Sequence, residues 1–215
     1  MRSPIWTLVL AALLQPGAAR AQQEVRLFLD AQASPWAAAG DPAPSAPGFF
    51  GRSESRFRRG GLVYEKLSAG ARSRVLEWLS LAAYYARDEN VYGDKARRRG
   101  DLLVGDLVLQ EALGPVRLLN REGNEWHVTD RYFEYRNLTE FLWRTPAQRV
   151  ALFAYDEFRI DSDDVRVTFN DLGGGVEVSS DTLVLRVFYD QEASRRLAPE
   201  WQRVRSLAVS FAVRR

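Results

Sequence analysis

The chain has 215 residues, with 30 Lys and Arg, 28 Asp and Glu, and a formal net charge of +2. It contains no cysteine, which excludes disulfide bonds and any cysteine-based metal or catalytic site. Such a nearly neutral chain lacks the basic surplus of nucleic-acid-binding domains, so we expect no nucleic-acid partner.

The first 21 residues are typical of a cleaved secretory signal. Arg2 gives a positive start, residues 5–14 are apolar, and Ala19-Arg20-Ala21 is a small-x-small cleavage site. The apolar run of ten residues is too short to span about 30 Å of hydrocarbon. We therefore expect export to the periplasm, cell envelope or exterior, no stable transmembrane helix, and a mature chain that begins at Gln22.

Removal of this signal leaves 28 basic and 28 acidic residues, divided unevenly along the chain. Residues 22–100 carry a net charge of +4 and residues 101–215 a net charge of −4. Either the two halves complement each other inside one domain, or the basic half contacts an anionic partner. The richness in Ala and Arg, together with the signal and the absence of cysteine, indicates a bacterial envelope protein.

The mature chain begins with a predicted strand over 22–30, in which Val25, Leu27 and Leu29 share one side. Residues 31–55 contain four prolines and three glycines, which predicts a linker. Residues 56–215, together with the first strand, are predicted to form one domain.

The stretch from Ser68 to Arg87 predicts an amphipathic helix. At 100° per residue, one face collects apolar residues: Val75, Leu79, Ala82, Ala83 and Ala86. Ser68 is suited to cap the first turn of this helix, because its hydroxyl can accept a hydrogen bond from a backbone amide that has no partner within the helix. We expect this helix to pack on a sheet, since a helix of this length is marginal alone in water.

After Gly100, strand patterns follow one another to the end of the chain. In the last of them, Leu207, Val209, Phe211 and Val213 alternate and are expected to face inward. The predicted fold is α+β, with a curved antiparallel sheet of about seven to nine strands and the one helix packed against it. The alternative is an eight-stranded outer-membrane β-barrel, which the length and the strand count permit.

Few residues are suited to catalysis or metal binding. His127 is the only histidine, and Asp130, three residues further along a strand, is expected on the other side of the sheet. The acidic run Asp161-Ser162-Asp163-Asp164 lacks the remainder of a calcium-binding loop, so a solvated turn is expected. We predict no catalytic residue, no metal and no cofactor.

Two basic clusters flank the predicted helix: RSESRFRR over 52–59 and KARRR over 95–99. Aromatic residues, including Trp126 and Tyr132, follow in the strands after the second cluster. The candidate partner-binding residues are Arg56, Arg58, Arg59, Arg97, Arg98, Arg99, Trp126 and Tyr132. The predicted function is a non-catalytic envelope binding or assembly module that contacts an anionic surface or another envelope protein. The alternative is a carboxylate-dependent hydrolase of an envelope polymer that uses Asp161, Asp163 or Asp164.

Overall fold

A computed structural model describes residues 22–33, 47–59, 61–90, 98–147, 149–163, 165–195 and 201–214. The predicted signal at 1–21 lies outside the described residues. The described chain forms eleven strands: β1 (Gln22–Ala33), β2 (Gly48–Arg58), β3 (Gly61–Leu76), β4 (Leu79–Asn90), β5 (Arg98–Leu113), β6 (Val116–His127), β7 (Tyr132–Arg144), β8 (Val150–Asp161), β9 (Arg166–Ser179), β10 (Leu183–Ser194) and β11 (Gln202–Arg214).

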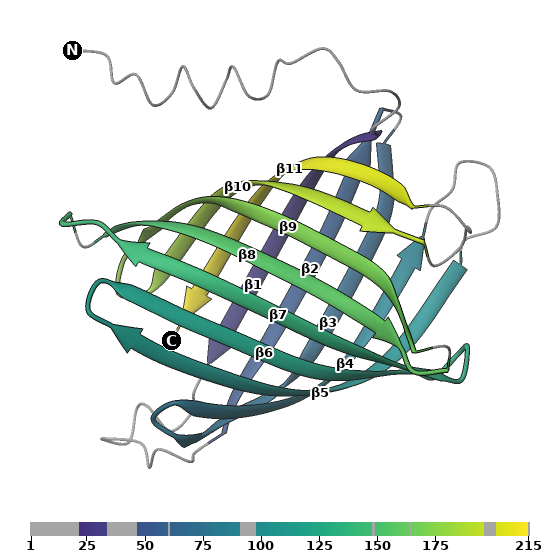
Figure 1. The fold of residues 1–215 in the computed structure, drawn as a ribbon, viewed down its shortest axis with the longest axis horizontal. Coiled ribbons are helices and arrows are strands. Elements are labelled where there is room, and N and C mark those ends of the chain that lie inside the picture. Colours follow the sequence, from purple (N-terminus) through teal and green to yellow (C-terminus); the bar gives the residue numbers. More distant parts are fainter. Residues whose placement is uncertain are drawn as a thin grey trace.

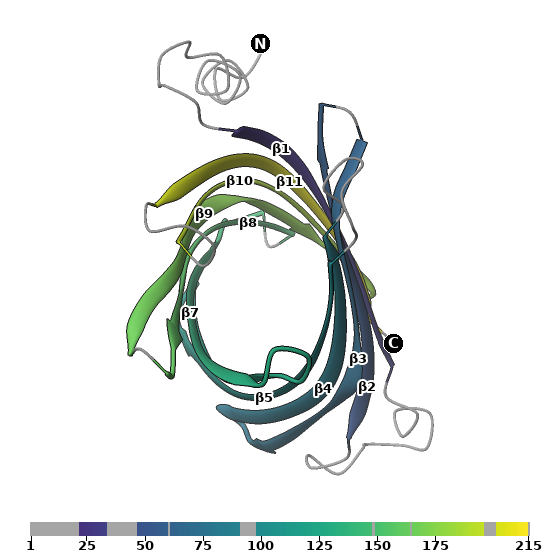
Figure 2. The same ribbon diagram turned by 90° about the vertical axis from the view of Figure 1, so that its right-hand side faces the viewer.

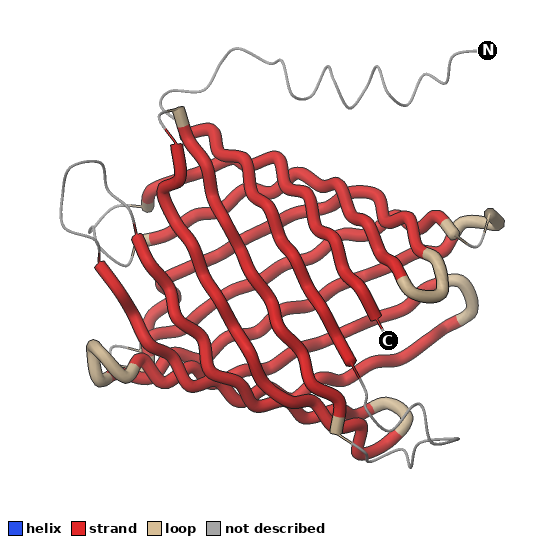
Figure 3. The backbone as a smooth tube through the Cα atoms, turned by 180° about the vertical axis from the view of Figure 1, so that it is seen from behind, coloured by secondary structure: helices blue, strands red, loops and turns tan. Residues whose placement is uncertain are grey.

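These strands close into one barrel in which each strand pairs antiparallel with its neighbour in sequence (Figure 1). Because the strand number is odd, β11 runs in the same direction as β1, and the barrel closes through a parallel pair with Val25 opposite Leu207. Figure 2 shows the strands surrounding a central axis. Figure 3 shows strands of the near and far walls crossing, as the tilt of barrel strands requires.

The fold corrects the α+β prediction. The predicted antiparallel pairing is present, but the sheet is closed, and no helix occurs in the part of the chain that the structure describes. The alternative of an outer-membrane barrel was closer in architecture, but its eight strands are too few. Eight strands leave an interior that side chains just fill, whereas eleven give a wider one.

The predicted helix over Ser68–Arg87 is instead the second half of β3 and most of β4. The chain turns at Glu77 and Trp78. In β4, Ala82, Tyr84 and Ala86 are buried inside the barrel while the residues between them are exposed. The inward-facing and outward-facing residues of β4 are both largely apolar, so the sequence shows no clear alternation with a period of two. Pairing with β3 and β5 outweighs the helix propensity of the alanines.

The predicted linker over 31–55 contains the end of β1 and the first part of β2. Gly173, Gly174 and Gly175 lie within β9. The Tyr155 ring covers Gly173 so closely that an added Cβ would lie 2.6 Å from the ring. A side chain at this position would therefore require the Tyr155 ring to move.

The barrel is apolar outside and charged inside. Val25, Leu27 and Leu29 of β1 are exposed. Glu24, which precedes Val25, and Arg26, which follows it, are buried. In β11, Leu207 and Phe211 are also exposed, at 36% and 39% of their surface, so the inward orientation expected for the apolar set is wrong. The alternation was correctly recognised, and its direction was reversed.

Inside the barrel, apolar side chains form two small groups among the charges. One contains Leu142, Ala151, Phe153, Phe188 and Ala208, and the other contains Tyr84, Ala86, Leu102 and Val104.

Outside, the apolar surface is interrupted in the middle of β6, β7 and β8 by outward-facing polar residues: Asn120, Glu122, Asn137, Thr139 and Asp156. Some of these residues satisfy one another, since Asn120 Nδ2 donates to Thr139 Oγ1 at 3.0 Å. Asp156 accepts from Asn170 at 2.7 Å.

Candidate lumen site

A cavity of about 470 Å³ occupies the barrel interior. We call the end where β1 begins the amino end and the end where β11 finishes the carboxyl end. The described residues that line the cavity reach Gln32 and Arg214 at the carboxyl end. Towards the amino end they stop at the level of Arg26 and Arg159, and Glu24 and His127 beyond them are not part of the lining.

The interior of the barrel contains two ion-pair networks, the first of which surrounds Arg26 of β1. This guanidinium is almost fully buried and lies 3.2 Å from Asp171, 3.1 Å from Asp190 and 2.5 Å from Glu192. Arg56 of β2 shares Glu192 at 2.7 Å. The contacts tie the first two strands of the chain to β9 and β10, across the parallel seam between β1 and β11.

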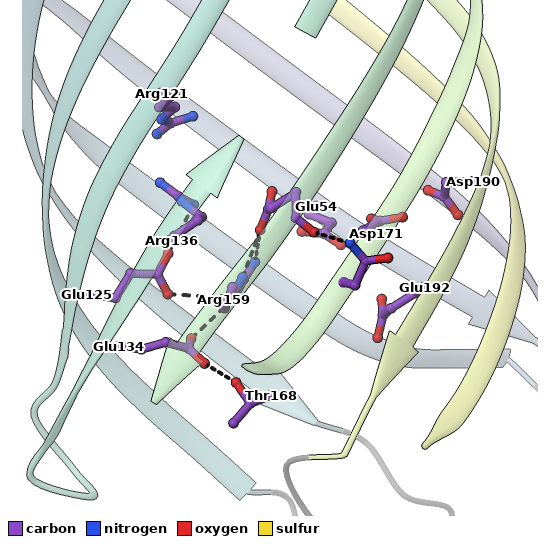
Figure 4. A network of polar contacts seen from close by, with 12 residues as sticks. Glu54, Arg121, Glu125, Glu134, Arg136, Arg159, Thr168, Asp171, Asp190 and Glu192 are labelled. Carbon is purple, nitrogen blue, oxygen red and sulfur yellow. Dashed lines mark hydrogen bonds and ion pairs between the residues drawn. The ribbon is translucent and has the colours of Figure 1, made fainter. Parts of the chain in front are cut away.

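The second network lies on β5 to β8 and is shown in part in Figure 4. Arg136 contacts Asp106 at 2.8 Å and Glu125 at 2.9 Å, and Arg121 also donates to Asp106, through Nε at 2.7 Å. Arg159 contacts Glu157 at 2.6 Å. Because these charges are buried, the attraction within each pair offsets the cost of removing it from water.

Glu125, His127 and Glu134 form a compact cluster behind the second network. The side-chain nitrogen and oxygen atoms that could bind a metal ion all lie within 4.8 Å of one another, and all three residues are buried. The His127 ring stacks on Tyr132 with centroids 4.1 Å apart, and Thr168 donates to Glu134 at 3.1 Å. Arg159 Nη1 lies 3.6 Å from Glu125 and 3.7 Å from Glu134, so a guanidinium already supplies positive charge where a metal ion would bind.

The carboxyl side of the interior is rich in arginine. Arg186 is held by Glu140 at 2.7 Å and by Glu177 at 2.7 Å. Arg117 lies 3.7 Å from the same Glu140, which is beyond hydrogen-bonding distance, and Arg214 is within electrostatic range of Arg117. Across the lumen, Arg72 is near both Arg52 and Arg121.

The structure distributes the predicted basic residues between the lumen and the amino-end rim. Arg56 and Arg58 point into the barrel, where Arg56 pairs with Glu54 at 2.6 Å and Arg58 with Glu24. Arg59 is exposed in the turn after β2, while Arg98 and Arg99 pair with Asp130 and Glu89. Arg97 lies outside the described residues.

The two predicted aromatic residues face opposite sides of the wall. Trp126 packs on Phe133 on the outer face, with centroids 4.4 Å apart, whereas Tyr132 stacks on His127 inside. Asp161 is the last residue of β8, and Asp163 lies in the turn that follows. The Asp163 amide donates to Asp161 at 2.9 Å, and neither residue lines the cavity. Asp164 lies outside the described residues.

The sequence analysis missed the residues that line the lumen. Arg26 and Arg186 each stand between apolar neighbours in a predicted strand. The apolar residues of the last strand were expected to face inward, which leaves the residues between them on the outside. The pattern was therefore visible, but nothing in it distinguished a solvated outer face from a charged lumen.

Barrel and cavity together define the class as a closed all-β barrel with a charged interior. No family model, curated protein or solved structure matches this chain. In the described residues, no helix is long and apolar enough to cross a membrane.

Proposed function

We propose that this protein is an integral β-barrel of a bacterial envelope membrane, and that its lumen receives polar solutes at the carboxyl end. The observation that carries the proposal is the polarity of the wall. Large apolar residues are exposed on the outside of most strands, while the buried set includes Arg26, Glu125, Glu134 and Asp190. A water-soluble protein has the opposite arrangement, because exposed apolar area is unfavourable in water.

The strand lengths support this proposal. The strands have 11 to 16 residues, and a tilted strand needs about 9–11 residues to cross the hydrocarbon core. Closure through β1 and β11 also satisfies the backbone groups of both terminal strands. Such closure is a requirement in lipid, where no water can bond to a free strand edge. The signal predicted at 1–21 would provide export.

Flotation and gel migration test the proposal. The protein, expressed with its predicted signal and purified in detergent, is reconstituted with phosphatidylcholine and centrifuged through a density gradient. We expect it to float with the lipid after a carbonate wash, and to migrate faster on an SDS gel when unheated than when boiled. If the protein is instead recovered, in the absence of detergent, from the gradient fraction that contains no lipid, membrane insertion is contradicted.

A carboxylate-dependent hydrolase is the second candidate, and one feature of the cavity favours it. Glu157 and Asp171 lie directly opposite each other on β8 and β9, and both line the cavity beside Tyr155. Paired carboxylates beside an aromatic wall are suited to glycoside hydrolysis. Hydrolysis of soluble envelope glycan fragments by the parent, and its loss in Glu157→Gln and Asp171→Asn, would support this candidate over a binding role.

A further inference from the structure

We propose that the lumen binds organic anions that carry an apolar group, and that Arg72, Arg117 and Arg214 hold the anionic group. This inference names the solute class of the lumen and rests on the proposed function, which makes the lumen accessible from the carboxyl end. It goes beyond that function because an accessible lumen by itself implies no preference for one charge.

The first argument is a surplus of positive charge around the cavity. Eleven cationic residues line it and only five acidic ones do. Each of the five carboxylates is already paired with an arginine; they are Asp30, Glu54, Glu140, Glu157 and Asp171. Several lining arginines are also paired with carboxylates outside the lining, as Arg121 and Arg136 are with Asp106. Among the described residues, Lys66, Arg72 and Arg214 line the cavity without a carboxylate partner within 4 Å, so the unpaired positive charge at the cavity comes from these three.

The second argument concerns hydrogen-bond donors. The Nε atoms of Arg72 and Arg117 are buried and have no hydrogen-bond acceptor among the described residues. A buried donor without an acceptor costs about 1–3 kcal/mol, and more when the group is charged. A carboxylate or phosphate in the cavity would accept hydrogen bonds from the other N–H groups of these two guanidinium groups, and guanidinium groups bind both anions in bidentate geometry.

The third argument is the apolar surface beside these arginines. Phe28, Phe50, Phe153 and Phe188 line the same cavity. Phe153 and Phe188 belong to an aromatic group with centroids 5.6 Å apart, and the Arg186 guanidinium lies over the Phe153 ring at 4.6 Å. An inorganic anion would leave this surface unused, whereas an organic anion would cover it.

The cavity volume is compatible with such a ligand. About 470 Å³ lies within the 300–1,000 Å³ range of small-molecule pockets. The lining reaches Gln32 and Arg214 at the carboxyl end and stops towards the amino end at the level of Arg26 and Arg159. The lining therefore describes a pocket entered from the carboxyl end.

Equilibrium dialysis in phosphatidylcholine nanodiscs tests the inference with three probes: 1-naphthyl phosphate, inorganic phosphate and 1-naphthol. Empty nanodiscs correct for partition into lipid. We expect saturable binding of 1-naphthyl phosphate, and affinity at least tenfold weaker for each of the other two probes. Raising the salt concentration should weaken binding, because screening reduces the attraction between charges.

The variant Arg72→Gln/Arg117→Gln should lose at least tenfold in affinity for 1-naphthyl phosphate. Arg203→Gln is the matched control, since Arg203 is exposed at the start of β11 and does not line the cavity. An unchanged affinity in the double variant would overturn the inference, as would equal loss in Arg203→Gln or equal binding of 1-naphthol. Equal affinity for inorganic phosphate would overturn the requirement for an apolar group.

Two readouts separate this inference from the proposed function. Each variant is first tested for flotation and heat-dependent migration, which show that the barrel has folded and inserted. A parent protein that floats but binds no 1-naphthyl phosphate refutes the solute class and leaves the membrane barrel standing. A parent protein that fails to float refutes the proposed function.

Discussion

Arg26 and Asp190 are 164 residues apart in the chain, yet their charged groups lie 3.1 Å apart inside the barrel. Arg26 is on β1 and Asp190 on β10, with β11 between them. The pair therefore spans the parallel seam at which the barrel closes. We infer that the network around Arg26 stabilises closure, in addition to the backbone hydrogen bonds of β1 and β11.

Arg26→Gln should destabilise the barrel by about 3–5 kcal/mol, because it leaves buried carboxylates without their shared counter-charge. Urea unfolding in detergent micelles, followed by tryptophan fluorescence, measures this loss. Arg26→Gln/Asp190→Asn should lose less than the single variant, since one of the buried, uncompensated carboxylate charges is also removed. A loss below 1 kcal/mol in the single variant would show that the network does not support closure.

An arginine placed on the outer wall should be costly only if lipid covers that wall. Val187→Arg in the middle of β10, where Val187 is exposed, should reduce stability by about 2–4 kcal/mol in phosphatidylcholine vesicles. Ser210→Arg on β11 is the control because Ser210 lines the lumen, and it should cost much less. Equal effects in the two variants would argue against a lipid-facing outer surface.

Gly175→Ala should destabilise the barrel, since the added Cβ would lie 2.2 Å from the Val187 carbonyl oxygen and 2.5 Å from Phe188 Cβ. Neither contact can be relieved by moving the end of a flexible side chain. We expect a loss of about 1–3 kcal/mol in the same urea experiment. Gly105→Ala, which meets nothing within 4 Å, should be near neutral, and a similar loss there would point to a general cost of replacing strand glycines.

A pair of alanine substitutions checks that β4 is a strand. Ala86 is fully buried inside the barrel, whereas Ala83 is exposed outside. Ala86→Leu should cost about 1–3 kcal/mol through overpacking, while Ala83→Leu should be neutral in lipid. A helix over Ser68–Arg87 would place both residues on one face, so similar losses in the two variants would contradict the strand.

The prediction from sequence succeeded where the period of two was clear. The strands at 22–30 and at the end of the chain were expected, and β1 and β11 contain them. It failed at β4, where Ala82, Tyr84 and Ala86 give the inner face nearly the same apolar character as the outer one.

The lumen site was beyond prediction for a related reason. Arg72 and Arg117 belong to β3 and β6, and only closure of the sheet brings them to one cavity. The sequence does reveal that strands such as 203–214 alternate charged or small residues with apolar ones. Their alternation is the same whether the apolar side faces a core or a lipid bilayer.

The sequence by itself therefore determined the alternation of side chains, the antiparallel pairing of successive strands and the absence of cysteine chemistry. Tertiary structure decided the number of strands in the closed sheet, the parallel pairing of Val25 with Leu207, and which face became the interior. The physical reason is that alternation and turns are local properties of the chain. Closure depends on hydrogen bonds between its two ends, and only closure separates an inside from an outside.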